Sequence, residues 1–321
     1  MKVFVSGGAG FIGSNLVDRL LCLGYEVVVF DNFSTGRVEF LAQATAADKN
    51  LTVLTGDLLN VGQIDEALDG VGAVVHLAAN ADVRFGWNHP RRDFEQNVIA
   101  TQNLLEVMRK REIKRFLFSS TGSVYGDAEV TPTPENAPFP AQTSLYGASK
   151  VAAEGLVSAY AENGYISGTV FRFVSILGPR YTHGHVIDFV AQLTRSPQRL
   201  TILGNGLQRK SYLHVSDCVE AITSRLSETP KYEVFNLGTD DFCTVRESAA
   251  WIAARMGLNP TFEFGNDVRG WVGDNPFIYL DTSRIRATSW QTTHSIKESV
   301  ESTVDWLLDN PWVLSAAVPN G

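Results

Sequence analysis

The fold of this 321-residue chain is decided near its amino end by the stretch Gly7-Gly8-Ala9-Gly10-Phe11-Ile12-Gly13. The stretch follows the apolar run Val3–Ser6 and leads into a segment in which Ile12, Leu16 and Leu20 recur every fourth residue, as on one face of a helix. Glycines between a strand and a helix leave the backbone N–H groups of the helix N-terminus open to an anion. The stretch therefore predicts a strand, a phosphate-binding turn and a helix.

The next predicted strand, Glu26–Asp31, ends in a carboxylate that lies eighteen residues beyond Gly13. A carboxylate at this point accepts hydrogen bonds from the ribose hydroxyls of adenosine and disfavours a 2′-phosphate. The spacing predicts NAD, rather than NADP, as the cofactor. The alternative is an ordinary glycine-rich turn followed by a solvated aspartate.

The first half of the chain alternates short β-branched runs with longer helical patterns. The predicted strands are Val3–Ser6, Glu26–Asp31, Thr52–Thr55, Ala73–Leu77, Phe116–Ser119 and Gly168–Phe173. The predicted helices are Ile12–Leu23, Ile64–Leu68, Phe94–Arg111 and Ser149–Glu162. Repeated strand–helix units of this length predict an α/β fold with a doubly wound parallel sheet.

The second half is less regular, because prolines and glycines interrupt the pattern from Pro179 onward. Two clear helices are predicted there, Val245–Met256 and Ile296–Leu308. We expect residues 1–174 to form the dinucleotide-binding domain and residues 175–321 a smaller α/β substrate-binding lobe over the carboxyl ends of the strands. A segment near residues 212–242 is expected to return to the sheet.

Composition narrows the class of protein. The chain has 27 Lys+Arg and 35 Asp+Glu, a net charge of −8, and no apolar run long enough for a membrane span, so neither nucleic acid nor a membrane is expected as a partner. The residues after Lys2 lack a signal-peptide pattern. The three cysteines are far apart, which argues against disulfides and favours the cytoplasm. His183 and His185 stand in poor metal geometry, and no metal is expected.

A second motif, Tyr146-Gly147-Ala148-Ser149-Lys150, carries two ionisable groups. Residues four apart share one face of a helix, so the phenol and the ammonium can meet, and a nearby cation makes a phenol more acidic. Taken alone the pair is usually solvated. The Tyr146–Lys150 pair indicates a functional site because the sequence also contains the hydroxyl run Ser119–Ser123. This run lies where an open α/β sheet binds its ligand.

Taken together, the motifs resemble those of extended short-chain dehydrogenases/reductases that act on nucleotide sugars, most of all UDP-glucose 4-epimerases. The early motifs are Gly7-x-x-Gly10-x-x-Gly13, Phe30–Gly36, Gly56-Asp57-Leu58, His76–Ala79, Val124-Tyr125-Gly126 and Tyr146-x-x-x-Lys150. The later ones are Gly204-Asn205-Gly206, Tyr212–Val215 and Asn236-Leu237-Gly238. The resemblance covers nearly the whole chain and implies a Rossmann fold, a nucleotide-sugar substrate and a homodimer.

The resemblance also implies roles for individual residues. Tyr146 is expected to be the acid/base on the sugar 4-hydroxyl, with Lys150 and Thr121 as its catalytic partners and the Lys150 charge favouring tyrosinate. The expected NAD-binding residues are Gly7, Gly10, Phe11, Ile12, Gly13, Asp31, Asn32, Ser34, Thr35, Gly36, Asp57, Leu58, Leu77, Ala78, Ala79, Asn97, Ser119, Tyr146, Lys150 and Phe173. The expected substrate-binding residues are Thr121, Ser123, Tyr146, Ser175, Val186, Thr201, Leu203, Arg209, Lys210, Tyr212, Arg269, Asp274 and Ile278.

Several positions bear on the choice among family members. Dehydratases and decarboxylases of this kind typically carry an acidic residue where this chain has Gly122-Ser123, which favours an epimerase acting through a 4-keto sugar. A dehydratase or reductase, or a non-catalytic NAD-binding sensor, stays as an alternative.

Other positions depart from the usual pattern and leave the substrate open. Ser175 replaces the usual asparagine, and Lys210 the usual arginine, so Arg209 is expected to compensate. Arg269 and, second to it, Arg180 are candidates for the diphosphate. Ile278 leaves a UDP-hexose and a UDP-N-acetylhexosamine both possible.

The resemblance places the dimer contact on the helices at Phe94–Arg111 and Ser149–Glu162. Leu104, Leu105, Val151 and Leu156 are apolar residues on these helices that fit such a contact or, alternatively, face the sheet.

Overall fold

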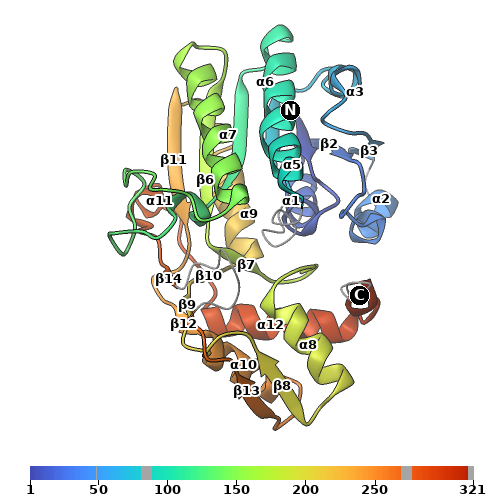
Figure 1. Cartoon of the computed structure of the whole chain (residues 1–321). Helices are drawn as coiled ribbons and strands as arrows, with labels where there is room; N and C mark the ends of the chain where they lie inside the picture. The colour runs from blue at the N-terminus through green and yellow to red at the C-terminus, as the bar shows by residue number, and fades with distance from the viewer. Residues whose placement is uncertain (48, 81–88, 269–276, 317–321) are drawn as a thin grey trace. The chain divides into compact units, whose positions relative to one another are not determined.

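The computed structural model describes residues 1–47, 49–80, 89–268 and 277–316 (Figure 1). The chain divides into two compact units, which we call the first and the second unit. The first unit comprises Met1–Gly126, Glu135–Phe173 and Val219–Asn236, and the second comprises Asp127–Pro134, Val174–Cys218 and Leu237–Gly321.

The first unit is built on a sheet that, within the described residues, has seven strands in the order β11-β6-β5-β4-β1-β2-β3. Their bounds are β1 Lys2–Ser6, β2 Glu26–Asp31, β3 Leu51–Thr55, β4 Ala73–His76, β5 Arg115–Thr121, β6 Ser167–Phe173 and β11 Tyr232–Leu237. Strand β1 pairs in parallel with β2 on one side and with β4 on the other. The chain therefore winds outward in both directions from β1, which confirms the predicted doubly wound sheet and places a ligand crevice at the carboxyl ends of β1 and β4.

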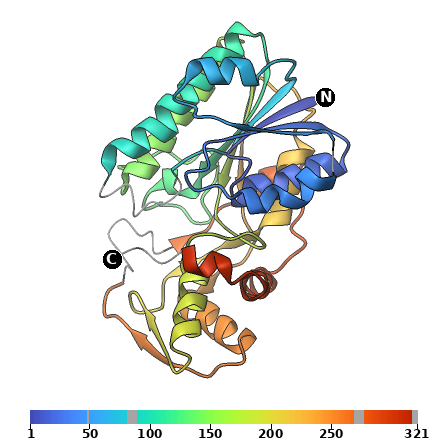
Figure 2. The ribbon, with the colours of Figure 1, turned by 90° about the vertical axis from the view of Figure 1, so that its right-hand side faces the viewer.

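Helices cover both faces of this sheet. Helices α3 (Val61–Ala67), α6 (Ala100–Lys110) and α7 (Leu145–Glu162) lie against one face, and α1 (Phe11–Cys22) lies against the other (Figure 2). The first group packs its apolar side chains onto Phe4, Phe116 and other inward residues of the strands. The short η1 (Val38–Leu41) and α2 (Ala42–Ala47) link β2 to β3.

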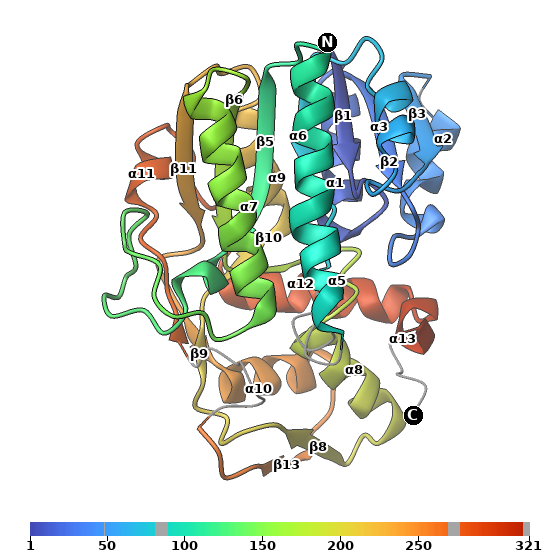
Figure 3. The same cartoon turned by 45° about the horizontal axis from the view of Figure 1, so that its top comes forward.

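The apolar residues of the two long helices on this face, α6 and α7, differ in how deeply they are buried. Leu104 and Leu105 of α6 are fully buried in the core of the sheet, as the second of the two predicted orientations required. Val151 and Leu156 of α7 are only partly buried. Figure 3 shows α6 and α7 lying side by side, and the contacts between the two helices agree.

The predicted ends of two helices were wrong by several residues. Helix α7 begins at Leu145 rather than Ser149, because the Ser144 hydroxyl caps it by accepting a hydrogen bond from Gly147 N at 3.0 Å. The second helix begins before Phe94, because Pro90 suits the first helical position. It runs through α5 (Pro90–Asp93), a π-helical turn η2 (Phe94–Ile99) and α6.

The second unit consists of short strands and mutually packed helices. Its strand pairs are β7 (Ser175–Leu177) with β10 (Tyr212–His214), and β8 (Arg199–Ile202) with β13 (Thr261–Phe264). Strand β9 (Arg209–Lys210) lies between β12 (Cys243–Thr244) and β14 (Phe277–Ile278). Its helices are α8 (His185–Arg195), α10 (Val245–Arg255), α11 (Ser283–Arg286), α12 (Ile296–Asp309) and α13 (Trp312–Ala316).

The chain forms more helices after Pro179 than the two that were predicted. Helix α8 and helix α9 (Val215–Ser224) are both regular, and α8 buries Val186, Phe189 and Leu193 on one face. Gly184 precedes α8 at its N-cap position, and Pro197 follows its C-cap. Glycine and proline therefore mark helix ends here instead of breaking helices.

Two further observations concern the whole of the described structure. Among the described residues, no helix is long and apolar enough to span a bilayer. Cys22 is exposed, Cys218 and Cys243 are buried, and all three are free thiols.

Candidate active site

The loop between β1 and α1 leaves no space for side chains. Gly7 has a φ of +69°, and a Cβ added to it would lie 2.7 Å from the backbone nitrogen of Ala78. A Cβ on Gly13 would lie 2.1 Å from the carbonyl oxygen of Gly7. Gly10 is the N-cap of α1, and no side chain caps the first N–H groups of the helix. The loop therefore fits a pyrophosphate bound by backbone N–H groups.

Asp31 lies at the carboxyl end of β2, next to this loop. Its Oδ2 accepts a hydrogen bond from Ala9 N at 3.0 Å, and its Oδ1 accepts one from Phe33 N at 2.9 Å. Burial raises the pKa of Asp31, and the two backbone hydrogen bonds oppose that rise. A carboxylate oxygen has two acceptor sites, so each oxygen retains one for a ribose hydroxyl. The residue fits the adenosine end of NAD.

The carboxyl ends of β2 and β3 are tied together by side chains. Asn32 Nδ2 donates to Asp57 Oδ2 at 3.1 Å, and Asp57 Oδ1 accepts from Leu59 N at 2.8 Å. Leu58, next to Asp57 in the sequence, is buried in the hydrophobic core of the first unit. Of the other predicted cofactor residues here, Ser34 and Thr35 are exposed, Gly36 is buried, and Ile12 and Leu77–Ala79 are half-buried.

A buried polar relay joins the first strand to the helix that follows β4. The Ser6 hydroxyl lies 2.7 Å from His76 Nδ1, and His76 Nε2 lies 3.0 Å from Thr101 Oγ1. The Thr101 hydroxyl donates to the Asn97 carbonyl at 2.7 Å, so it must accept from His76 Nε2–H, and Nδ1 then accepts from Ser6. Burial, with a smaller effect of the Lys150 charge, lowers the pKa of His76 to about 3 and keeps the ring neutral.

Lys150 lies on α7, one turn after Tyr146, and is almost fully buried. Its Nζ donates to the carbonyl of Ser119 at 2.8 Å and lies 4.8 Å from the centroid of the Phe118 ring. Burial lowers the pKa of Lys150 to about 8, and the charge of Glu154 opposes the decrease. The ammonium is therefore held at the carboxyl end of β5.

Thr121 ends β5 and begins the short helix η3 (Gly122–Tyr125). Its Oγ1 accepts from Ser123 N at 3.1 Å and lies 3.2 Å from Ser123 Oγ. It also forms a hydrogen bond with the Tyr146 phenol, which lowers the pKa of Tyr146. The structure thus brings Thr121, Tyr146 and Ser123 together at the carboxyl end of β5.

The expected effect of the Lys150 charge on the pKa of Tyr146 stays a prediction. Burial is the largest influence and raises the pKa of Tyr146 to about 12, and the charge of Asp93 raises it further. The ammonium of Lys150 is instead directed at the Ser119 carbonyl. Asp93 was not foreseen as a site residue, because nothing in the local sequence indicates that its carboxyl group is buried.

Asn97 lies in the π-helical turn η2, a type of turn often found at functional sites. Its Nδ2 donates to Ser149 Oγ at 2.9 Å, and Ser149 Oγ donates to the Tyr146 carbonyl at 2.7 Å. Its Oδ1 accepts from Asn80 N at 2.9 Å. Asn97 therefore fixes the first turn of α7 through its amide group.

A buried ion pair lies one helical turn beyond Lys150. Arg172 on β6 donates to Glu154 on α7 at 2.7 Å, and the Ser120 hydroxyl also donates to Glu154. Arg172 reaches the Tyr125 hydroxyl at 2.6 Å. Phe173, a predicted cofactor residue, is buried next along β6. The ion pair, with the hydrogen bond from Ser120, connects β5, β6 and α7.

In the second unit, two predicted substrate residues lie opposite each other across paired strands. Lys210 on β9 is the register partner of Ile278 on β14. Arg209 is exposed, and its guanidinium lies 4.0 Å from the centroid of the Phe277 ring. The Arg209 guanidinium therefore contacts the Phe277 ring. Lys210 and Ile278 lie side by side on adjacent strands.

The remaining candidates of the second unit differ in burial. Ser175, Thr201 and Leu203 are exposed, and Arg180 is half-buried. Tyr212 is buried, and Val186 packs entirely within the core, so only its backbone can reach a ligand. Arg269 and Asp274 lie outside the described residues.

His185 was not predicted as a site residue, yet it is the neighbour of Lys210. Its Nε2 lies 2.8 Å from Ser248 Oγ, and its Nδ1 lies 3.5 Å from the Tyr212 hydroxyl. Burial and then the Lys210 charge lower the pKa of His185 to about 4. Over the described part of the chain, no group of three His, Cys, Asp or Glu side chains is arranged to hold a metal ion.

The fold and these contacts define a class: a dinucleotide-binding α/β enzyme with a Tyr–Lys pair at the carboxyl end of its central strands. Comparison with known proteins gives the family. The sequence model of the NAD dependent epimerase/dehydratase family matches residues 3–238. The chain belongs to this family of enzymes, and NAD is its cofactor.

Individual relatives agree with the family assignment. The putative UDP-glucose 4-epimerase of Methanocaldococcus jannaschii is 30% identical over 319 residues, which cover 96% of this chain and 99% of the relative. A crystal structure of a UDP-galactose 4-epimerase is 36% identical, with a TM-score of 0.85 over 97% of this chain and 100% of the other. The dTDP-glucose 4,6-dehydratase DesIV from Streptomyces venezuelae, solved with NAD, is 27% identical, with a TM-score of 0.89 over 97% and 98% of the two chains. This chain is thus similar to UDP-glucose 4-epimerases and to related sugar-nucleotide enzymes.

Proposed function

We propose that the chain is a nucleotide-sugar 4-epimerase that acts on a UDP-hexose or a UDP-N-acetylhexosamine through a 4-keto sugar. The observation that carries the proposal is the cluster of Tyr146, Thr121 and Lys150 at the carboxyl end of β5, beside a loop that fits the pyrophosphate of NAD. Together these groups supply one proton acceptor on the side of the sheet where the cofactor binds.

The chemistry needs a single group that first takes a proton and later returns it. Tyr146 must be in its phenolate form for this step: its Oη then accepts the proton of the sugar 4-hydroxyl while the carbon–hydrogen bond at carbon 4 breaks, and hydrogen bonding by Thr121 favours the phenolate. When bound, NAD supplies a hydride acceptor that is regenerated within the same cycle. The 4-keto sugar then turns over and takes the hydride back on the opposite face of carbon 4, and the phenol returns the proton to the resulting oxyanion.

A dehydratase is the second candidate, and the likeness to the Streptomyces venezuelae dehydratase supports it. Elimination across carbons 5 and 6 requires a further acid/base pair. Gly122 and Ser123 begin η3, and Ser123 is engaged with Thr121, so this turn supplies no carboxylate. This favours the epimerase. Net reduction of a sugar and non-catalytic sensing of NAD are the remaining alternatives, and the intact Tyr146–Lys150 pair argues against the second.

Recognition of the nucleotide sugar is assigned to the second unit. We propose that Lys210 contacts the diphosphate and that its strand partner Ile278 lies near the 2-substituent. Arg269 and Asp274 are proposed from the sequence alone. A lysine provides a point charge instead of a two-pronged guanidinium clamp, so a second cation is needed for the diphosphate.

The experiment is a panel of UDP-, dTDP-, GDP- and CDP-sugars, with the products resolved by NMR. Epimerase activity gives a mixture of the two 4-epimers without accumulation of NADH. Tyr146→Phe should lower turnover by about 10²–10⁴-fold and still bind NAD. Tyr165→Phe is the matched control, since the ring of Tyr165 meets the Tyr160 ring edge to face and Tyr165 is not among the proposed site residues. Wild-type interconversion by Tyr146→Phe refutes the mechanism, and a 4-keto-6-deoxy product establishes the dehydratase.

Two further expectations belong to this proposal. We propose a homodimer formed through α6 and α7, in which the partly buried Val151 and Leu156 are available and the core residues Leu104 and Leu105 are not. A sedimentation mass near the 35.2 kDa of one chain would exclude the dimer. The three free cysteines favour a reducing compartment such as the cytoplasm.

A further inference from the structure

His76, the last residue of β4, is a fully buried histidine that the proposed reaction does not use. Both ring nitrogens have a side-chain partner: Ser6 Oγ lies 2.7 Å from Nδ1, and Thr101 Oγ1 lies 3.0 Å from Nε2. The backbone carbonyl has a third partner, because the Ser119 hydroxyl donates to it at 3.1 Å. An apolar side chain would fill this place in the core without any polar partner. The arrangement therefore indicates that His76 orders the groups around it.

The hydrogen bonds of the His76 ring run in one direction. Nε2 carries the ring proton and donates to Thr101, because the Thr101 hydroxyl itself donates to the Asn97 carbonyl at 2.7 Å. Nδ1 accepts from the Ser6 hydroxyl, and Ser6 Oγ accepts from Ala78 N at 3.4 Å. One unbroken series of hydrogen bonds thus leads from Ala78, beside the glycine loop, to Asn97.

This series continues from Asn97 to Tyr146. Asn97 Nδ2 donates to Ser149 Oγ at 2.9 Å, and Ser149 Oγ donates to the Tyr146 carbonyl at 2.7 Å. Thr101, Asn97 and Ser149 are all buried, so water does not replace a partner that is lost. A displacement of the Thr101 hydroxyl therefore reaches the first turn of α7.

The main chain of His76 is connected to Lys150. Ser119 donates to the His76 carbonyl through its hydroxyl, and its own carbonyl accepts from Lys150 Nζ at 2.8 Å. His76 and Phe118 are register partners on β4 and β5, so His76 is anchored to the strand that holds the ammonium. One residue of β4 is thus linked to both members of the Tyr146–Lys150 pair.

We infer that His76 is a positioning residue of the Tyr146–Lys150 pair: through Thr101 and Asn97, its imidazole holds the helical turn that carries Tyr146 in place relative to the β5 carbonyl that binds Lys150. The effect on turnover rests on the proposed epimerase function. A group that takes a proton and returns it must be held within about 0.5 Å of its productive position. Side-chain hydrogen bonds between the sheet and the first turn of α7 meet that requirement.

Two substitutions of His76 separate its side-chain contacts. The amide of Gln reaches as far as Nε2 and can donate to Thr101, whereas the amide of Asn, one methylene shorter, reaches only as far as Nδ1 and can meet Ser6. His76→Gln therefore keeps the connection to Tyr146, and His76→Asn breaks it. Thr101→Val breaks the same connection with His76 intact, and Thr101→Ser keeps the hydroxyl.

Thr303→Val is the matched control for Thr101→Val. Both threonines are fully buried, and Thr303 Oγ1 also donates to a carbonyl one turn back, that of Ser299, at 2.7 Å, but in the second unit. The full chain with NAD is measured in two ways. Hydrogen exchange reports on the backbone amides of residues 147–150, and turnover of UDP-glucose gives kcat and KM.

Thr101→Val and His76→Asn should speed exchange in this turn about tenfold, because one buried hydrogen bond is lost. They should also lower kcat by up to about 10²-fold with KM unchanged, since a small misplacement of Tyr146 slows proton transfer. Thr101→Ser and His76→Gln should each lie nearer to the wild type than their partner variant does. Thr303→Val should leave both readouts unchanged.

Wild-type exchange at residues 147–150 in Thr101→Val would overturn the inference. Equal acceleration in Thr303→Val would also overturn it, because the effect would then be general destabilisation, as would equal exchange in His76→Gln and His76→Asn. The proposed function fails separately, when the wild type does not epimerise any sugar nucleotide of the panel or when Tyr146→Phe still interconverts epimers. In that case hydrogen exchange still decides whether His76 positions the turn.

Discussion

The Asp31 carboxylate and the backbone N–H of Ala9 form a hydrogen bond of 3.0 Å between the end of β2 and the glycine loop that follows β1. The same carboxylate accepts from Phe33 N, so it is held on both oxygens. One residue therefore shapes the glycine loop, and we propose that the same carboxylate presents its negative charge to the adenosine ribose. On this proposal, loop geometry and cofactor choice are linked through the Asp31 side chain.

Asp31→Asn should weaken NAD and favour NADP. The amide still has an oxygen acceptor, but it loses the negative charge that repels a 2′-phosphate. We expect the Kd for NAD to rise about tenfold, which corresponds to about 1.4 kcal/mol, and the Kd for NADP to fall. Isothermal titration calorimetry with both dinucleotides measures the ratio. Glu39→Gln, at an exposed carboxylate of η1, is the control, and an unchanged ratio in Asp31→Asn would contradict the assignment.

Burial of Lys150 should make the stability of the protein depend on alkaline pH. The pKa of Lys150 is lowered from 10.5 to about 8, so between these values the unfolded chain binds the proton and the folded chain does not. Folding stability therefore rises with pH across this window. Lys150→Met lacks the charge and should be more stable than the wild type below pH 8, by up to about 3 kcal/mol, with the difference closing toward pH 10.5.

Urea unfolding on both sides of this window measures the effect, and Lys231→Met, at an exposed lysine paired with Glu162, is the matched control. A constant difference between wild type and Lys150→Met at all pH values would show that Lys150 is not desolvated in the folded state.

The buried pair of Glu154 and Arg172 should be costly to break. Both side chains are at least 94% buried, so Glu154→Gln leaves the guanidinium without its counter-charge. We expect a loss of about 3–5 kcal/mol in the free energy of unfolding. Asp305→Asn breaks the exposed pair with Arg255 and should cost less than about 1 kcal/mol. Equal losses in the two variants, measured by urea unfolding, would disprove the special role of the buried pair.

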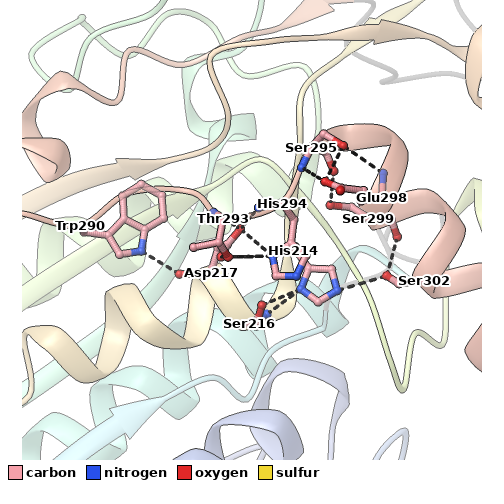
Figure 4. A network of polar contacts seen from close by, with 10 residues as sticks. All are labelled: His214, Ser216, Asp217, Trp290, Thr293, His294, Ser295, Glu298, Ser299 and Ser302. Carbon is pink, nitrogen blue, oxygen red and sulfur yellow. Dashed lines mark hydrogen bonds and ion pairs between the residues drawn. The ribbon is translucent and has the colours of Figure 1, made fainter.

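His214 anchors a polar network within the second unit (Figure 4). Its Nδ1 lies 2.7 Å from Ser216 Oγ, its Nε2 lies 3.1 Å from Ser302 Oγ on α12, and its ring stacks on His294 at 4.0 Å. Asp217, which is almost fully buried, lies 3.3 Å from His294 Nδ1. The network joins β10, α9 and α12.

Acidification should weaken this network. Burial first, and the charge of His294 second, lower the pKa of His214 from 6.5 to about 4. Between these values the unfolded chain binds a proton that the folded chain excludes, so stability falls as pH falls. His214→Gln should remove a slope of about 1.4 kcal/mol per pH unit from that window. The exposed His183→Gln is the comparison in urea unfolding series, and an unaltered slope in His214→Gln would show that His214 is already charged when folded.

The local pattern predicted the elements whose backbone conformation is set by neighbours in sequence. The glycines from Gly7 to Gly13, the strand that ends at Asp31 and the four-residue spacing of Tyr146 and Lys150 are all recognisable in short stretches. Hydrophobic period and glycine placement act over a few residues, so the parallel sheet and the NAD loop could be predicted. Helix ends such as Leu145 were missed, because a single cap at Ser144 decides them.

The tertiary structure alone decided what surrounds each ionisable group. Asn80, Asp93, Asn97 and Ser149 come from separate segments, and the sequence gives no sign that they form one cluster around Tyr146. The neutral His76 and the pairing of Lys210 with Ile278 likewise depend on contacts between distant residues. Proton affinity depends on burial and on charges within a few ångströms. The chain sequence therefore determined which chemical groups are present, and folding determined how readily each gives up its proton.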